Sequence, residues 1–249
     1  MPRTARVDVA GHCYHVLNRA NARYRIFRKD EDFEAFERVL AEAVVRAGDS
    51  GGSVSLLAYC VMGNHWHLVL RTHEDGAMGR MMKWLTTTHA GRYRVAHRAS
   101  GGQSGVGHLY QGRYKSFLIE GEAHLLTVCR YVERNAVRAG LVPSGKAEDW
   151  RWSSLHRWRF GDDEAKSILR PWPVTASGLN DERRFNRPKQ WLRTVNTPIN
   201  EAELEALRTA AQRGRPYGSA AWVERMVKRH GLASTVRSPG RPRNEEERT

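Results

Sequence analysis

Hydrophobic and polar positions repeat with two different periods along the first 160 residues, and each period predicts one type of element. Runs rich in β-branched and aromatic residues, typical of strands, occupy residues 12–18, 54–62, 65–71 and 113–120. Apolar residues spaced three and four apart, typical of amphipathic helices, occupy residues 30–47, 78–98 and 122–139. Gly63 and Asn64 tolerate positive φ, so they predict a hairpin turn between the second and third strands.

The resulting order, β-α-β-β-α-β-α, predicts an α+β fold built on a ferredoxin-like (RRM-like) antiparallel sheet with helices. Two helices are expected on one face of the sheet. The other face is either open or covered by the helix at 122–139. Further helical patterns at 201–212 and 220–230 predict a basic, helical C-terminal extension.

Positive charge is concentrated in two blocks of the 249-residue chain, whose 41 Lys+Arg and 27 Asp+Glu give a formal net charge of +14. Residues 1–160 carry a net +9 and residues 181–249 a net +6, whereas residues 161–180 carry −1. We therefore expect a main domain over 1–160, a linker or docking segment over 161–200, and a basic helical tail over 201–249 whose last residues are disordered. This charge favours a polyanionic partner such as nucleic acid; the alternative is a basic surface kept for solubility.

Membrane and disulfide-based classes of protein are disfavoured by the sequence. No apolar run approaches the roughly 20 residues that span a bilayer, so no membrane partner is expected. The three cysteines, Cys13, Cys60 and Cys129, are scattered and lack C-x-x-C spacing. This usage fits a reducing compartment, and we expect a cytoplasmic protein.

His65 and His67 are two positions apart in a predicted strand, so both side chains leave the same face of the sheet. Trp66 then points to the opposite face, toward the core. Two adjacent imidazoles commonly form part of a divalent-metal site, and the alternative is a pair of solvated surface histidines. The apolar run at 68–70 makes this strand central, where a polar pair requires a partner.

The predicted helix at 122–139 places Thr127, Tyr131, Asn135 and Arg138 along one stripe. A tyrosine phenol can act as a covalent nucleophile toward a reactive electrophile. The side-chain carbonyl of Asn135 is a hard oxygen ligand that suits Mg²⁺ or Mn²⁺. The alternative is a half-buried core tyrosine beside an exposed asparagine.

Four stretches of the chain together resemble the REP-associated tyrosine transposases, a group of single-tyrosine HUH transposases. They are residues 14–19 (YHVLNR), 62–70 (MGNHWHLVL), 107–116 (GHLYQGRYKS) and 131–142 (YVERNAVRAGLV). The resemblance implies the same ferredoxin-like fold, a nucleophilic Tyr131, and one Mg²⁺ or Mn²⁺ ion held by His65, His67 and Asn135. This chain departs from many relatives in having Ala136 rather than proline after the asparagine. Glu133 and Arg134 are also unusual beside the tyrosine.

The activity implied by the resemblance is that of a metal-dependent, hairpin- and sequence-specific single-stranded DNA endonuclease and strand transferase. It would act on repeated extragenic palindromes through a 5′-phosphotyrosine intermediate, in a bacterial, nucleoid-associated monomer or homodimer. DNA contacts are expected from Arg19, Arg113, Tyr114, Lys115, Arg138, Arg213, Arg215, Arg241 and Arg243. Two alternatives stay open: a catalytically silent DNA-hairpin-binding regulator of repeat elements, and an RNA-binding module built on the same type of sheet.

Overall fold

A computed structural model of the chain describes residues 6–49, 53–98, 107–170, 172 and 187–237. Arg241 and Arg243, and the disorder expected for the last residues, lie outside the described residues. Within the described residues, no helix is long and apolar enough to cross a membrane.

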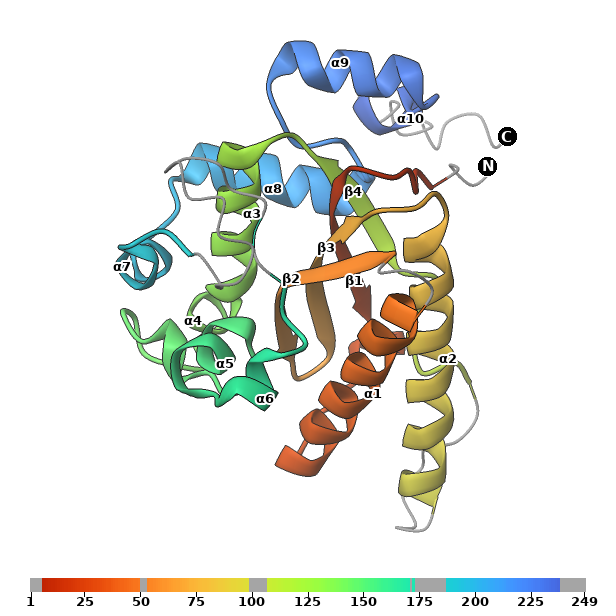
Figure 1. The fold of residues 1–249 in the computed structure, drawn as a ribbon, viewed down its shortest axis with the longest axis vertical. Helices are drawn as coiled ribbons and strands as arrows, with labels where there is room; N and C mark the ends of the chain where they lie inside the picture. The colour runs from red at the N-terminus through yellow and green to blue at the C-terminus, as the bar shows by residue number, and fades with distance from the viewer. Residues whose placement is uncertain (1–5, 50–52, 99–106, 171, 173–186, 238–249) are drawn as a thin grey trace, which may run out of the picture.

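The predicted order of strands and helices is confirmed over the first 133 residues (Figure 1). The elements are β1 (Cys13–Arg19), α1 (Asp30–Asp49), β2 (Val54–Met62), β3 (His65–Thr72), α2 (Ala77–Arg98), β4 (Lys115–Ile119) and α3 (Glu122–Glu133). A short 3-10 turn, η1 (Asn21–Arg23), follows β1. The strand β4 begins two residues later than expected, so Arg113 precedes the strand instead of lying within it.

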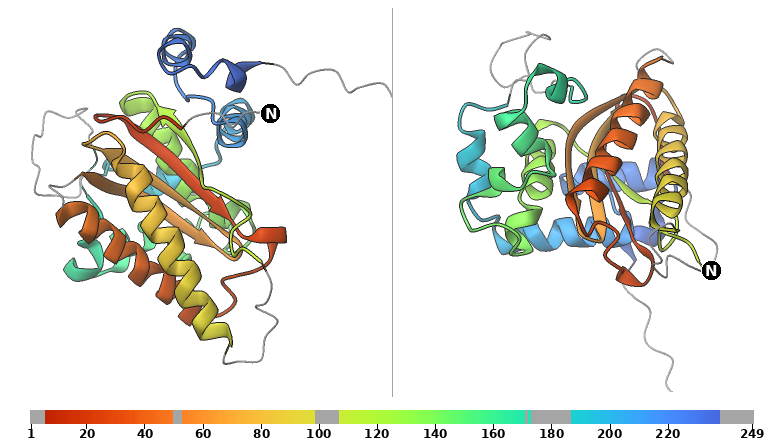
Figure 2. Two further views of the ribbon diagram at one scale, coloured as in Figure 1. Left: turned by 90° about the vertical axis from the view of Figure 1, so that its right-hand side faces the viewer. Right: turned by 90° about the horizontal axis from the view of Figure 1, so that it is seen from below.

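The four strands form one antiparallel sheet in the order β2-β3-β1-β4. This order, with two helices between strands, is the ferredoxin-like arrangement that the sequence predicts. Helices α1 and α2 cover one face of the sheet, and α3 covers the other, as Figure 2 shows from two sides. The face left undecided by the sequence is therefore covered by the tyrosine helix.

The side chains of β3 divide between two hydrophobic cores, one on each face. Trp66 and Leu68 are fully buried against α1 and α2, on residues such as Phe36. Val69, on the other face, belongs to the core beneath α3, together with Val128. Since alternate residues of a strand face opposite ways, His65 and His67 must share the α3 face with Val69.

The expected single helix over 122–139 is interrupted, because α3 ends at Glu133 and the short α4 (Asn135–Arg138) follows. Backbone hydrogen bonds from Arg134 N to Arg130 O and from Arg138 N to Arg134 O continue the helical direction across the break. Gly140 follows with a φ of +68°, the left-handed conformation expected of a glycine helix cap. The stripe that carries the tyrosine is therefore kept, although the helix is not continuous.

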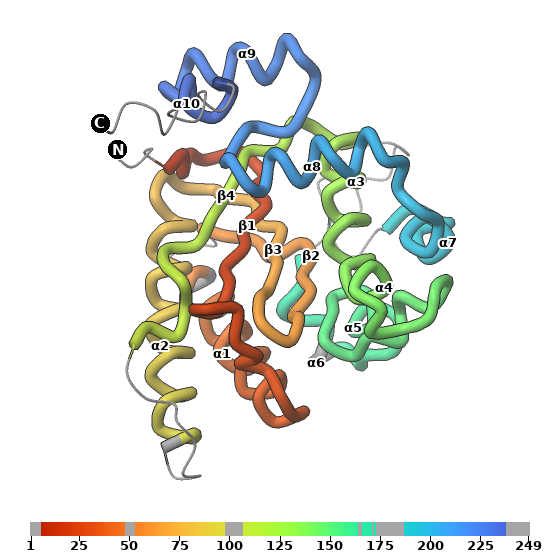
Figure 3. The backbone as a smooth tube through the Cα atoms, turned by 180° about the vertical axis from the view of Figure 1, so that it is seen from behind, coloured from red at the N-terminus to blue at the C-terminus, as the bar shows by residue number. Residues whose placement is uncertain are grey.

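The C-terminal half packs around the sheet through a turn, η2, and short helices. These are η2 (Ala147–Asp149), α5 (Ser154–Phe160), α6 (Asp163–Lys166), α7 (Trp191–Asn196), α8 (Glu201–Arg213), α9 (Ala220–Arg229) and α10 (Ala233–Val236). Helix α7 contacts α3, and α8 lies beside β4, as the view from behind shows (Figure 3). Main-chain hydrogen bonds join Tyr217 to Leu118 and Glu120, so the segment after α8 pairs with the outer edge of β4.

Candidate active site and nucleic-acid groove

The structure brings Tyr131 of α3 against His67 of β3, and His65 lies next to His67. The ring centroids of Tyr131 and His67 are 5.9 Å apart, and those of His65 and His67 are 5.1 Å apart. Tyr131 is 6% exposed and His67 is 4% exposed. The contact arises because α3 packs on the sheet face from which both imidazoles project.

One nitrogen of each histidine ring is engaged by a neighbour, and the other remains open. His65 Nδ1 lies 2.6 Å from Asn64 Oδ1, and His67 Nδ1 lies 2.8 Å from His15 Nε2. Among the described residues, no hydrogen bond reaches Nε2 of either His65 or His67. Two Nε2 atoms on one face of a strand are thus available as ligands.

The electrostatic setting keeps both rings neutral at physiological pH. Burial, with smaller contributions from Arg19 and Arg138, lowers the pKa of His65 to about 4. Burial, followed by the neighbouring His15 and His65, lowers the pKa of His67 well below its usual value. Neutral imidazoles keep the lone pair that coordinates a metal.

Asn135 is fully buried one turn after the tyrosine, and its side chain is held in place. Its Oδ1 accepts a hydrogen bond of 2.6 Å from Arg138 Nη2, and its Nδ2 donates to Val132 O at 3.4 Å. The guanidinium carbon of Arg138 also lies 5.3 Å from the centre of the Tyr131 ring. Arg138 therefore places positive charge beside the phenol and beside the amide.

The donor types suit a divalent cation: two imidazole nitrogens on β3 and an amide oxygen on α4. In the described part of the chain, no three His, Cys, Asp or Glu side chains gather as a metal-binding group. An amide such as Asn135 could supply a further oxygen ligand beside His65 and His67. A carbonyl oxygen has two lone pairs, so Asn135 Oδ1 retains one beside its bond to Arg138.

Glu133 and Arg134, the residues that look unusual beside the tyrosine, attach its helix to the segment before α8. Glu133 is fully buried, and its carboxylate accepts hydrogen bonds from Ser154 Oγ, Arg187 Nη1 and Trp191 Nε1. Arg134 Nη1 donates to the main-chain oxygens of residues 195 and 196. These contacts hold the C-terminal end of α3 in a fixed position over the sheet.

His15 is the residue of this site that the sequence reasoning missed. It is fully buried on β1, and its ring stacks on His67 with centroids 5.0 Å apart. Burial lowers the pKa of His15 to about 3. A sequence signal existed, since His15 is a polar residue between Tyr14 and Val16 in the predicted strand 12–18.

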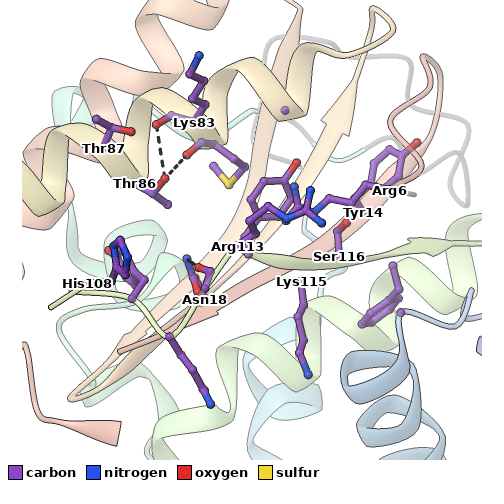
Figure 4. A pocket seen from close by; sticks show the side chains of 18 of the residues that line it. Arg6, Tyr14, Asn18, Lys83, Thr86, Thr87, His108, Arg113, Lys115 and Ser116 are labelled. Carbon is purple, nitrogen blue, oxygen red and sulfur yellow. Dashed lines mark hydrogen bonds between the residues drawn. The ribbon is translucent and has the colours of Figure 1, made fainter. Parts of the chain in front are cut away.

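A basic cavity of about 1380 Å³ lies along β4, between α2, the segment 108–118 and the C-terminal helices (Figure 4). Its lining includes six cationic side chains and, within the described chain, no Asp or Glu. The six are Arg6, Lys83, Arg94, Arg113, Lys115 and Arg213. A groove with charge of one sign is typical of a surface that follows a phosphate backbone.

The groove collects four of the residues expected to contact DNA. Arg113 and Lys115 are exposed on it, and Lys115 Nζ donates to Gln212 O at 3.2 Å. Arg213 lines the facing wall. Tyr114 also lines it, but the ring is only 8% exposed and Arg6 lies over it, 4.0 Å from its centroid. The groove therefore presents guanidinium and ammonium groups more than aromatic faces.

The other expected DNA contacts lie elsewhere. Arg19 stands directly opposite His65 in the β1–β3 register, on the active-site face of the sheet. The main-chain oxygen of Arg19 accepts a bond from Gln111 N, which joins this corner to the groove lining. Arg215 is exposed in the segment after α8. Lys83 and Arg94 also line the groove but were not among the expected DNA contacts. Both lie on the polar face of α2, and the helical spacing of polar residues in the sequence could have predicted this.

A second cavity, of about 680 Å³, opens beside the tyrosine itself. Tyr131, Arg134 and Arg138 form one wall, and Leu141 and Leu204 contribute apolar surface. Tyr131 thus borders a space whose lining includes two arginines.

Comparisons with known proteins relate the chain to transposases. The family model described as "Transposase IS200 like" matches residues 8–135. Among solved structures, a REP-associated tyrosine transposase bound to a REP hairpin is similar at 18% identity and a TM-score of 0.44, covering 75% of this chain and 100% of that one. A candidate transposase from Deinococcus radiodurans is similar at 20% identity and a TM-score of 0.37, covering 53% of this chain and 96% of that one. No curated protein matches the chain.

Proposed function

Because this chain belongs to the family of IS200-like transposases, which are single-tyrosine HUH nucleases, we propose that it cuts and rejoins single-stranded DNA through Tyr131. The observation that supports the proposal is the contact between Tyr131 and His67, which in turn contacts His65. These residues come from elements far apart in sequence and meet on one face of the sheet. That juxtaposition supports Tyr131 as the nucleophile and His65 and His67 as the metal-ligating residues.

The chemical step follows from a tyrosine nucleophile. The phenolic oxygen of Tyr131 attacks the scissile phosphorus, and the bond from phosphorus to the 3′ oxygen of the preceding nucleotide breaks. The products are a 5′-phosphotyrosine and a free 3′-hydroxyl, which receives the proton that the phenol loses. The phosphotyrosine stays reactive, so a later strand transfer needs no external energy source.

Four side chains assist this step. His65, His67 and Asn135 would hold Mg²⁺ or Mn²⁺, which when bound polarises the scissile phosphate and stabilises its developing charge. Arg138, which lies over the Tyr131 ring and binds Asn135, provides fixed positive charge where negative charge develops. Both roles use neutral or cationic groups, as an anionic substrate requires.

The DNA path runs along the basic groove toward the corner of the sheet that carries Arg19 and His65. Arg113, Lys115 and Arg213 would contact phosphates, with Arg215, Arg241 and Arg243 of the tail extending the contact. We propose a hairpin of a repeated extragenic palindrome as the substrate, as the four sequence stretches imply. The protein would then act at the bacterial nucleoid, in the cytoplasm.

We also propose how the chain is organised. Residues 1–160 form the catalytic unit, the segment within 161–200 docks on α3, and residues 201–249 extend the DNA contact. The pairing of Tyr217 with the outer edge of β4 supports a monomer over a homodimer built by continuing the sheet. Light scattering on the free protein distinguishes the two.

The test is an adduct assay with a hairpin oligonucleotide from a palindrome repeated near the gene, with and without Mn²⁺. The wild type should form a covalent protein–DNA adduct only with the metal, and Tyr131→Phe should form none. Tyr93→Phe, on α2 across the sheet, is the matched control and should react normally. An RNA hairpin of the same sequence should give no adduct.

Three outcomes would overturn the proposal. An adduct formed by Tyr131→Phe would remove the assigned nucleophile. Salt-sensitive hairpin binding by the wild type without cleavage under any divalent metal would instead identify a silent DNA-binding regulator. Equal affinity for RNA and DNA hairpins would point to the RNA-binding module.

A further inference from the structure

His15 lies at the centre of the sheet, on the face that carries the tyrosine. Its ring is fully buried between His67 and Phe117, with centroids 5.0 and 4.8 Å away, and Tyr131 lies at 6.2 Å. Its Nε2 is 2.8 Å from His67 Nδ1. Among the described residues, its Nδ1 is buried with no hydrogen-bond partner. Leaving such a buried atom unpaired is unfavourable, so an imidazole at this position needs a reason beyond packing.

The contact between His15 and His67 admits two arrangements of protons. A short N–N contact joins one donor nitrogen to one acceptor nitrogen, so a single proton lies between His15 Nε2 and His67 Nδ1. If His15 Nε2–H donates, the proton of His67 must sit on its own Nε2, which then has no lone pair for a cation. If His67 Nδ1–H donates, the lone pair stays on His67 Nε2, and the proton of His15 sits on the unpartnered Nδ1.

We propose that His15 is a positioning residue of the metal site: its Nε2 accepts the hydrogen bond from His67 Nδ1–H and so keeps His67 Nε2 open for a divalent cation. The outer partner of a ligating histidine commonly sets which ring nitrogen binds the metal. Here the partner is a second imidazole, which performs this role without adding negative charge next to an anionic substrate. The inference rests on the proposed function only in requiring that His65 and His67 bind a cation.

The first test measures Mn²⁺ affinity without DNA, by electron paramagnetic resonance of the free ion. His15→Leu removes the acceptor and should weaken Mn²⁺ binding by roughly 10–100-fold. His15→Gln offers a side-chain carbonyl to the same N–H and should restore most of the affinity. His89→Gln is the control, since His89 is a buried histidine on the opposite face, bonded to Tyr110. It should leave Mn²⁺ affinity unchanged.

A second measurement needs no variant. In the wild type loaded with diamagnetic Mg²⁺, long-range ¹H–¹⁵N correlations of the histidine rings should place the proton of His67 on Nδ1 and that of His15 on Nδ1. A proton on His15 Nε2, or unchanged Mn²⁺ affinity in a folded His15→Leu protein, would overturn the inference.

These readouts separate the inference from the proposed function. Neither depends on Tyr131 or on cleavage, so adducts formed by Tyr131→Phe would overturn the nucleophile and leave the role of His15 intact. A wild type that binds no Mn²⁺ would overturn both the metal site and the role of His15.

Discussion

Breaking the buried ion pair of Glu133 should destabilise the protein strongly, because this carboxylate organises the end of the tyrosine helix. Glu133 is fully buried, and Arg187, its ion-pair partner, has a side chain only 3% exposed. Ser154 and Trp191 donate to the same carboxylate. Replacing Glu133 with alanine leaves a buried guanidinium without an anion and removes the acceptor of two further donors.

The size of the effect follows from the cost of an unpaired buried charge. Removing one partner of a buried ion pair typically costs about 3–5 kcal/mol. In the variant, Arg187 still interacts with the rings of Trp158 and Trp172, whose centres lie 5.0 and 4.6 Å from its guanidinium. These cation–π interactions reduce the loss of stability. A change of this size lowers the Tm of a domain of this length by roughly 6–20 °C.

Urea denaturation followed by tryptophan fluorescence and circular dichroism measures the effect. A double-mutant cycle with Arg187→Met and Glu133→Leu isolates the pair from the loss of packing. The double variant should be less destabilised than the sum of the two single variants by at least about 2 kcal/mol, because it leaves no unpaired charge. A loss below about 1 kcal/mol in Glu133→Ala, with no coupling in the cycle, would refute the reasoning.

Three more predictions follow from the site and the groove. The pKa of His15 is lowered to about 3 and that of His89 to about 4, chiefly by burial, so unfolding takes up protons below about pH 6.5. The free energy of unfolding should therefore fall by roughly 2 kcal/mol for each of these histidines between about pH 7 and about pH 5, as measured by urea unfolding. His89→Gln should remove the part of this fall that His89 causes. A free energy of unfolding that does not change with pH would contradict the prediction. Lys115→Ala should reduce the salt slope of hairpin affinity by roughly 0.7, while Arg159→Ala, on α5, should not change it. Arg138→Gln should slow adduct formation on the order of 100-fold, and an unchanged single-turnover rate would exclude its proposed role.

The sequence by itself determined the local structure and the candidate chemistry. Its two periodicities placed the strands and helices of the ferredoxin-like sheet nearly to the residue, because side-chain burial repeats every two residues in a strand and every three to four in a helix. The same alternation put His65 and His67 on one face and Trp66 on the other. These features depend on neighbours in the chain, which the sequence displays directly.

The tertiary structure decided what those residues meet. Nothing local shows that α3 covers the face of the two histidines, that His15 contacts His67, or that Arg187 neutralises Glu133 from 54 positions away. The division of the predicted helix at Arg134 has the same origin, since it coincides with contacts from a later segment.

The basic groove shows the distinction most clearly. Its cations come from the N-terminal segment, α2, the start of β4 and the end of α8, which are brought together only when the chain folds. The net charge of +14 predicted a polyanionic partner but could not locate its surface, because composition carries no information about position in space. Segments far apart in the sequence bury one another's side chains and bring their charges together. For this physical reason, only the folded structure shows where the site lies.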